Sequence, residues 1–464
     1  MHAPPDQRGQ VVTILQGFDS NLQALYIYGI GGINGTNNVR GVNFMNGVNA
    51  TKKFFVCMAF VFLPALVFAA EKFDLEVYAT QFDSIPIGVV NFKSTNENRL
   101  KENFPWDVLA NNLDFSGRFG VSQRAEFDSA YFHGRGIGVY VDGEYTLDGD
   151  RIQVLCVLRD VGTRTQLISK RYSGEVKFLR SMIHRYSNEL VDMLFSEKGI
   201  FETRVLYVRQ EGQNKNIAIM DFDGHSRSRL TNNKTINIFP VFADKSTVLW
   251  TSYQRGKPDI YKGSITGGTS KVFLQGKGMM VSPDVSPIDG TVAYASSQTG
   301  TLNIFVCAPD GSKPRQLTFN RSINTAPNWS PNGYQIAFTS DRGGGPQIYI
   351  MDATGSNQRR VTFEGRYNDA PAWSPKGDKI AYTSQGDNSQ FNIWTVSPDG
   401  SDAKMVANPS GLNETPTWSP DGRLIGFINT KGGKSDFYVV RHDGERLRKV
   451  TTSGDVRMPR WSGF

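Results

Sequence analysis

Residue types that carry most enzyme chemistry are sparse in this chain, and their spacing does not suit catalysis. The five histidines among 464 residues are scattered, and no two stand at the spacing of a metal-ligand pair. No Gly-x-Ser-x-Gly sequence occurs, so the nucleophile elbow of propeller-bearing serine peptidases is lacking. Glycines 343–345 are not followed by Lys and Ser or Thr, which excludes a Walker-type phosphate loop. The sequence therefore predicts a protein that is not an enzyme, with no catalytic residue, cofactor or metal site.

The remaining polar candidates have structural interpretations. Asp310 and Asp399 each precede a glycine, and an aspartate at that position caps a turn. His184 belongs to a helical segment, and we expect its side chain to be partly exposed and without a catalytic role. Cys156 and Cys307 lie in apolar, strand-like runs of different predicted domains, which favours two buried free thiols over a disulfide.

Composition limits the kind of partner. The formal net charge is +7, and Lys and Arg are scattered rather than grouped in blocks. An evenly solvated basic surface of this kind does not indicate nucleic-acid binding. A hydrophobic fraction of 39% and 47 glycines suit a turn-rich globular protein with room for two or three domains.

One phrase recurs along the C-terminal part of the chain. The stretch APAWSPKGDKIAYTS, residues 370–384, has near-copies at 326–340 and 415–429. The aligned tryptophans are separated by 44, 45 and 43 residues, and steps of 44 and 43 residues back from the first reach Val285 and Phe242. The four tryptophans, Val285 and Phe242 thus give six equivalent positions, which we call the repeat marks. Their period of about 44 residues indicates the four-stranded blades of a β-propeller. The aligned tryptophans are Trp329, Trp373, Trp418 and Trp461.

The last repeat consists of its opening strand alone. Its other strands stand before the first complete repeat, in RVLYV, NIAIMDFDG and SRLT, which ends at Thr231. Five whole repeats and one shared repeat therefore predict an all-β six-bladed β-propeller, closed by joining its N-terminal and C-terminal strands so that no sheet edge is exposed. In this fold Trp373 and its equivalents are apolar wedges between blades, and the Pro and Gly of the motif form turns. The repeated motif is scaffold.

Residues 71–200 have a different period and predict a small α+β domain before the propeller. Residues 85–92 are a buried strand, and 98–113 have helical spacing that is interrupted at Pro105. Three antiparallel strands follow within 136–174. The last segment, 176–199, is a helix whose apolar face consists of Phe178, Met182, Tyr186, Leu190 and Leu194.

The sequence of residues 45–70 is typical of an export signal. Residues 51–70, TKKFFVCMAFVFLPALVFAA, have two lysines, an apolar run too short for a typical spanning helix, and small residues at the cleavage position. We interpret 45–70 as a signal peptide that starts at Met45 and is cleaved after Ala69 or Ala70, with an uncleaved anchor as the alternative. We interpret 1–44 as a non-native upstream extension, which leaves 71–200 and 201–464 as the folded domains.

A signal peptide, a small α+β domain and a propeller of these repeats together resemble the TolB family of the Tol-Pal envelope system of Gram-negative bacteria. The junction SEKGIFETRVLYV, 196–208, carries the resemblance most specifically, together with IPIGVVNF, DGEYTLDGDRIQVLCVLRDV and the closing MPRWS. It covers essentially all of 71–464. The resemblance implies a monomeric periplasmic adaptor without an active site or membrane insertion after cleavage. Such an adaptor links the outer-membrane lipoprotein Pal to inner-membrane TolA and supports outer-membrane invagination at division.

The resemblance also implies where the two partners bind. TolA would bind the start of the mature chain, Glu71 to Thr80, whose alternating pattern suits addition of a strand to a partner's sheet edge; its residues are Glu71, Phe73, Leu75, Val77 and Tyr78. Within the domain itself, the same segment would be an edge strand. Pal would bind the loops that lead into each Pro-x-Trp strand, at the rim residues Met279, Ser282, Thr325, Asn368, Asp369, Glu414 and Arg457. The family can carry a histidine at the position of Met279, so this contact would be apolar here.

Two other classes of protein remain open. A six-bladed propeller can be a hydrolase or lyase with a metal or acidic cluster in its channel, but the aligned repeats show no equivalent set of inward carboxylates or histidines. A secreted propeller outside the Tol system could instead bind carbohydrate or peptide. A Pal-like lipoprotein and a TolA-like protein as partners distinguish the adaptor from both.

Overall fold

The computed structural model describes residues 12–14, 73–75, 84–386 and 389–463. The chain divides into two units, 1–82 and 83–464. Within the first unit, strand β1 (Val12–Ile14) pairs antiparallel with β2 (Phe73–Leu75). The predicted signal peptide, residues 45–70, lies outside the described residues, as do Glu71, Val77 and Tyr78. Among the helices that are described, none has both the length and the apolar character needed to cross a membrane.

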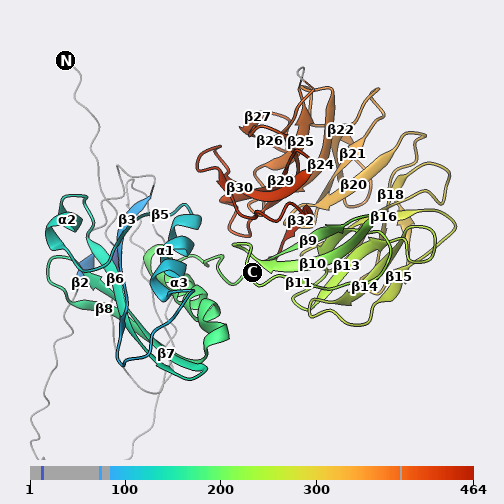
Figure 1. Cartoon of the computed structure of the whole chain (residues 1–464). Coiled ribbons are helices and arrows are strands. Elements are labelled where there is room, and N and C mark those ends of the chain that lie inside the picture. The colour runs from blue at the N-terminus through green and yellow to red at the C-terminus, as the bar shows by residue number, and fades with distance from the viewer. Residues whose placement is uncertain (1–11, 15–72, 76–83, 387–388, 464) are drawn as a thin grey trace, which may run out of the picture. The chain divides into compact units, whose positions relative to one another are not determined.

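The second unit begins with a mixed α/β domain (Figure 1). Its sheet has the order β5-β3-β6-β7-β8, with β3 parallel to both β5 and β6 and with antiparallel β6–β7 and β7–β8 pairs. The strands are β3 (Ile85–Val90), β4 (Lys93–Ser94, paired with β6), β5 (Phe119–Arg124), β6 (Val139–Asp148), β7 (Arg151–Asp160) and β8 (Gln166–Glu175). The helices are α1 (Pro105–Phe115), α2 (Ser129–His133) and α3 (Leu179–Phe195), the last preceded by the 3-10 turn η1 (Val176–Phe178).

Two details of this domain differ from the sequence prediction. Helix α1 begins at Pro105 rather than being interrupted there, because a proline fits the first helical position, where no N–H partner is needed. The buried face of α3 includes Tyr186 and Leu190 as expected, but Phe178 is 49% exposed. Phe178 lies in η1, one residue before the α-helix begins, so its side chain does not belong to the apolar face of α3.

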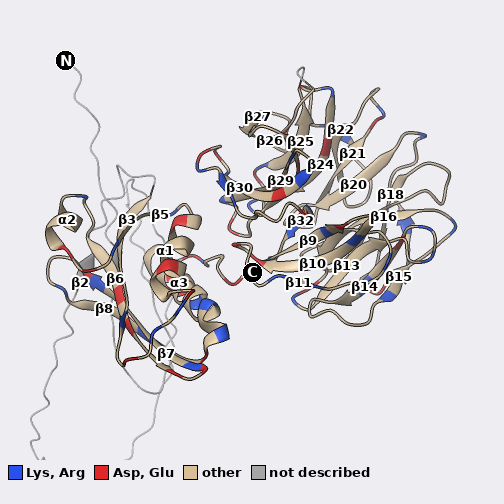
Figure 2. Cartoon of the chain, viewed as in Figure 1, with Lys and Arg blue, Asp and Glu red and all other residues tan. Residues whose placement is uncertain are grey.

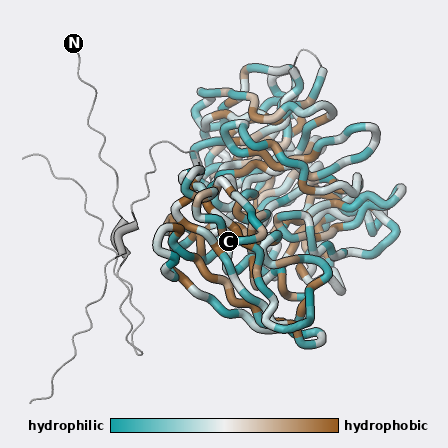
Figure 3. Tube along the Cα trace, turned by 60° about the vertical axis from the view of Figure 1, so that its left-hand side comes forward, coloured by the Kyte–Doolittle hydropathy of each residue, from teal (hydrophilic) through white to brown (hydrophobic). Residues whose placement is uncertain are grey.

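Residues 204–461 form six four-stranded antiparallel sheets, which are the six predicted blades (Figure 1). Figure 3 shows hydrophobic stretches of the trace within the body of the folded part and hydrophilic stretches mostly where the trace turns at its periphery. Five blades are continuous in sequence, and β32 completes the first. The blades are β32 (Val456–Trp461) with β9 (Arg204–Glu211), β10 (Asn214–Asp221) and β11 (Ser228–Arg229); β12 (Asn237–Phe242), β13 (Thr247–Ser252), β14 (Asp259–Ser264) and β15 (Lys271–Leu274); β16 (Met280–Val285), β17 (Val292–Ser296), β18 (Asn303–Cys307) and β19 (Arg315–Gln316); β20 (Asn324–Trp329), β21 (Gln335–Ser340), β22 (Gln347–Asp352) and β23 (Arg359–Arg360); β24 (Tyr367–Trp373), β25 (Ile380–Gln385), β26 (Phe391–Val396) and β27 (Lys404–Ala407); and β28 (Leu412–Trp418), β29 (Leu424–Lys431), β30 (Lys434–Arg441) and β31 (Arg448–Lys449).

The six repeat marks end the first strand of each blade, and the tryptophans lie in the cores between blades. Trp329 packs with Ala293, Ile304 and Val306 of the preceding blade, and Trp373 and Trp418 occupy the corresponding place in the next two cores. Each first strand contacts the first strands of both neighbouring blades, so these six strands surround the axis of the ring. The interpretation of the tryptophans as wedges is confirmed.

Each first strand carries the same local distortion. The residue before the proline has a left-handed backbone, with φ between 47° and 54°, and the pairing with the second strand shifts register at this point in all six blades. A non-glycine residue in this region is strained, and a bulge of this kind bends a strand and redirects its side chains. The six residues are Phe239, Ser282, Ala326, Ala370, Thr415 and Met458.

The ring closes where β32 pairs antiparallel with β9, as predicted, and Figure 1 shows these two strands side by side. Trp461 donates its indole N–H to Thr203 Oγ1 at 2.9 Å and its backbone N–H to Thr417 Oγ1 at 3.0 Å, which joins the last strand to both neighbouring segments. Arg460, also on β32, forms an ion pair with the buried Asp284 of β16. Asp284 also accepts the backbone N–H of Trp329 at 2.7 Å.

We expect Arg460→Met to lower the free energy of unfolding by about 3 kcal/mol, because it leaves the Asp284 carboxylate buried without its cation. Urea unfolding followed by tryptophan fluorescence measures the change. The double variant Asp284→Asn/Arg460→Met is the control, and it should recover most of the loss because no uncompensated charge remains. A single variant within about 0.5 kcal/mol of the parent would contradict this role for the pair.

Candidate functional site

The predicted partner-binding loops all lie at one end of the ring. In every blade the first strand begins, the second ends and the third begins at this end, which we call the entry end. The turns after the first strands and after the third strands lie at the opposite end, which we call the exit end. Loops of short hairpins on a closed ring form a rigid surface, and such surfaces commonly carry binding residues.

The structure brings five of the seven predicted rim residues to the channel mouth or the surface at the entry end. Met279 is 41% exposed, and its backbone N–H donates to Ser297 Oγ at 2.9 Å, so the loop is fixed while the thioether faces solvent. Thr325, Asp369, Glu414 and Arg457 are half-buried and occupy the same position in four consecutive blades, one residue before the left-handed residue.

Two of the predicted rim residues do not belong to the exposed rim. Asn368 is fully buried, where its amide donates to Gln347 Oε1 at 2.7 Å and to the carbonyl of Glu364 at 2.7 Å. Ser282 is 7% exposed and is the left-handed residue of its strand. Asn368 lies on the buried face of β24, and Ser282 lies at the bulge of β16, which the sequence pattern alone did not reveal.

The charged residues of the mouth compensate one another. Asp369 accepts hydrogen bonds from Thr339 Oγ1 at 2.7 Å and from its neighbouring Ala370 N–H at 2.7 Å. Burial raises the pKa of Glu414, while the charge of Arg457 in the next blade opposes that rise. The nearby charge of Asp369 also raises the pKa of Glu414, so the two carboxylates and Arg457 form one polar group at the mouth.

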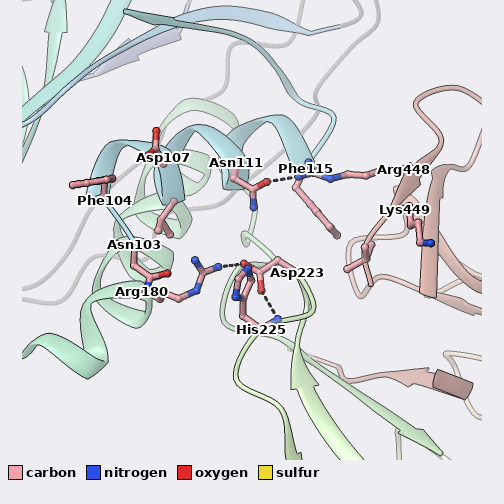
Figure 4. Close-up of a pocket in the computed structure, with 12 residues that line it drawn as sticks. Asn103, Phe104, Asp107, Asn111, Phe115, Arg180, Asp223, His225, Arg448 and Lys449 are labelled. Atoms are coloured by element: carbon pink, nitrogen blue, oxygen red, sulfur yellow. Dashed lines mark hydrogen bonds and ion pairs between the residues drawn. The ribbon is translucent and has the colours of Figure 1, made fainter. Parts of the chain in front are cut away.

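A second polar cluster joins the α/β domain to the exit end of the ring, and sequence reasoning missed it (Figure 4). It borders a pocket of about 350 Å³, with Asn111 of α1 and Arg180 of α3 on one side and Asp223, His225 and Arg448 on the other. Arg180 pairs with Asp223, and Arg448 donates to Asn111. The only hint of this cluster in the sequence was the presence of charged side chains beside the Asp-Gly turns of the repeats. Such side chains are too common to indicate an interface.

His184 is part of this cluster, and the expectation that it is partly exposed is wrong. Its side chain is 4% exposed because α3 packs against α1 and against the turn that holds Phe222 and Asp223. His184 Nδ1 lies 3.0 Å from the amide nitrogen of Asn112, and Nε2 lies 3.9 Å from Asp223 Oδ2. Burial is the main cause that lowers the pKa of His184 to about 4.

Ligand-type atoms of His184, Asp221 and Asp223 lie within 4.8 Å of one another, so this group could in principle hold a cation. Arg180 already supplies the positive charge for Asp223, which makes a structural role the better interpretation. The group also lies at the exit end, away from the channel mouth. Elsewhere the predictions for polar residues are confirmed: Asp310 and Asp399 cap their turns, and Cys156 and Cys307 are buried free thiols.

We expect His184→Gln to reduce the acid sensitivity of the fold. The folded pKa of His184 is about 4 against 6.5 unfolded, so its neutral form is favoured in the folded protein. The contribution of neutral His184 to the free energy of unfolding is fully present above pH 6.5. It is lost as the pH falls toward 4, and the loss is about 2 kcal/mol at pH 5. Urea unfolding of the parent and the variant at about pH 7.5 and about pH 5 gives the free energy of unfolding at each pH. The difference between the two proteins measures how much of the loss depends on His184.

His133→Gln, at an exposed histidine of α2, is the matched control, because it makes the same substitution outside the interface. If His184→Gln and the parent lose the same stability between the two pH values, the buried neutral histidine does not govern the interface.

Comparison with known proteins gives matches to both folded parts. A family model described as the TolB beta propeller domain matches residues 191–464, and one described as the TolB amino-terminal domain matches residues 73–167. The Tol-Pal system protein TolB of Desulfosudis oleivorans is 31% identical over 244 residues, which cover 48% of this chain and 55% of the relative. The protein of the same description from Geobacter sulfurreducens is 38% identical over 148 residues, which cover 30% of this chain and 34% of the relative.

These matches span about half, or less, of the length of the curated relatives. Among solved structures, the crystal structure of TolB from Acinetobacter baumannii superposes with a TM-score of 0.71 at 24% identity, covering 82% of this chain and 97% of that chain. This likeness concerns the fold, including a domain of helices and mixed sheet before a six-bladed propeller.

Proposed function

Because the chain belongs to the TolB family, we propose that it is a non-enzymatic component of a Tol-Pal system that links a Pal-like lipoprotein to a TolA-like protein. The observation that carries the proposal is the match of both TolB domain models, in order, to the two folded parts of the chain. Curated relatives bear the description Tol-Pal system protein TolB. The role at cell division and in envelope integrity follows from the same resemblance.

The rigid entry end supports the choice of a protein partner. Short loops of six blades meet there, and this end carries the exposed thioether of Met279 as well as the half-buried polar side chains of Thr325, Asp369, Glu414 and Arg457. An apolar contact surrounded by polar groups is the usual composition of a protein interface. We propose this end as the surface that binds the Pal-like lipoprotein.

The second partner and the location rest on the N-terminal segment. We propose that residues 45–70 direct export to the periplasm, that 1–44 precede the native start, and that 71–200 and 201–464 are the mature domains. The segment Glu71–Thr80 would then be the mature N-terminus, with Phe73 and Leu75 alternating with polar residues as a strand-adding motif does. We assign this segment to a TolA-like protein.

We expect Met279→Asn to weaken binding of the soluble domain of the Pal-like lipoprotein by about tenfold, which corresponds to ~1.4 kcal/mol. The change removes apolar contact area at the entry end without adding charge. Isothermal titration calorimetry with the full mature chain measures the dissociation constant.

Ile288→Asn is the matched control, because Ile288 is 67% exposed in the same blade but lies in the turn at the exit end. It should bind as the parent does. If the parent binds no Pal-like domain, the proposed function is wrong; if both variants bind alike, the interface lies elsewhere.

We expect the protein recovered from the periplasm to begin at Glu71 or one residue earlier, since the small residues at 69–70 form the cleavage position. N-terminal sequencing of the protein from a periplasmic extract tests both export and the start of the mature chain. Recovery from the cytoplasm with Met1 retained would contradict the proposed location.

A further inference from the structure

The two ends of the propeller differ in the sign of their exposed charge. In the described loops at the entry end, five exposed residues are basic and one, Glu364, is acidic. The hairpin of β29 and β30 ends at the same side with two more exposed lysines. The exposed basic residues of the entry end are Lys234, Arg255, Lys277, Arg321, Arg366, Lys431 and Lys434.

The loops at the exit end have the reverse balance, with seven exposed acidic and five exposed basic residues among those described. Several of these acids have a structural task that explains their position. Asp244, Asp289, Asp310 and Asp399 each accept hydrogen bonds from the backbone of their own turn. The basic entry end is therefore a local feature and does not follow from the overall charge of the chain.

Acidic groups do occur at the entry end, but those described other than Glu364 are half-buried or buried. Glu211 and Asp455 pair with Arg209, and Asp341 accepts the backbone N–H of Ile323. Asp369 and Glu414 are half-buried and are compensated by hydrogen bonds and by Arg457, as described above. Asp259 and Asp436, also at this end, are buried and pair with Lys257 and Lys449. What a partner meets first is thus positive charge. Figure 2 shows charged residues mainly at loops and strand ends, with the strands between them uncharged over most of their length.

Apolar side chains lie within the same loops. Phe319 is 78% exposed and lies in the loop that follows β19. Phe363 is 69% exposed, but its ring lies against Gly400 in the exit-end turn of the next blade. Ile323 is 49% exposed, and Met279 and Leu412 are each 41% exposed. Four of the ten large apolar side chains that are exposed in the described chain, Met279, Phe319, Ile323 and Leu412, therefore belong to entry-end loops.

We propose that the entry end binds an acidic protein face, one that presents carboxylates around an apolar centre. This inference rests on the proposed function and specifies the chemistry of the Pal-like domain that would fill it. Apolar anchors among basic residues suit a folded protein, because interfaces combine an apolar core with a polar rim in which Arg is common. The charge complementarity would mainly accelerate association, since exposed charges steer encounter more than they add affinity.

The test compares association rates of the soluble Pal-like domain with the full mature chain by stopped-flow fluorescence. Lys277→Glu/Arg321→Glu reverses two charges at the entry end, and Lys245→Glu/Lys313→Glu makes the same change in net charge at the exit end. At about 0.01 M salt, where screening extends ~30 Å, we expect the first pair to associate about tenfold more slowly than the parent, and the second pair to change less than twofold. At about 1 M salt, all three proteins should associate at similar rates.

The outcomes separate the two proposals. If the parent does not bind the Pal-like domain at either salt concentration, the proposed function is wrong and this inference falls with it. If the parent binds but its rate is independent of salt, or both charge reversals slow it equally, the function stands and the acidic partner face is wrong. Sedimentation with vesicles that contain anionic lipid is the second probe, and vesicle binding lost specifically in Lys277→Glu/Arg321→Glu would assign the entry end to a lipid surface and overturn the proposal.

Discussion

The pairing of β32 with β9 is the interaction on which the rest of the propeller depends. Without it, one blade would lack the strand nearest the axis, and both that blade and the one formed by β28–β31 would lose a neighbour. Backbone pairing alone would leave the closing strand free to slip. Trp461 and Arg460 fix its position, because they contact Thr203, Thr417 and Asp284 on three different segments of the ring.

The architecture could be predicted from sequence because each repeat has the same kinds of core and turn residues at the same positions. Trp373 and its equivalents mark the core between blades, and the turn residues mark where strands end, so counting repeats was enough to give six blades and the shared one. Positions next to these marks were harder to assign. Asn368 is buried although its neighbour Asp369 is not, because successive side chains of a strand point to opposite faces and the repeats did not show which face of β24 is buried.

The interface between the two folded parts could not be predicted in this way. His184 lies on a helix whose pattern allows either a buried or an exposed histidine, and the choice depends on Phe222 and Asp223, which stand about forty residues away in sequence. The same holds for the charge of the two ends of the ring. Lys and Arg are scattered along the chain, and only the strand order shows that those of alternate loops meet at one end.

The position of the closing strand at the end of the chain also determines when the propeller ring can close. Strand β9 is synthesised early in the propeller, but its partner β32 follows it only after roughly 250 further residues. Until then the edge of β9 has open hydrogen-bonding groups, a condition that favours pairing with other chains. A protein of this topology therefore has an open edge on its first blade for the whole time that the remaining five blades are being synthesised.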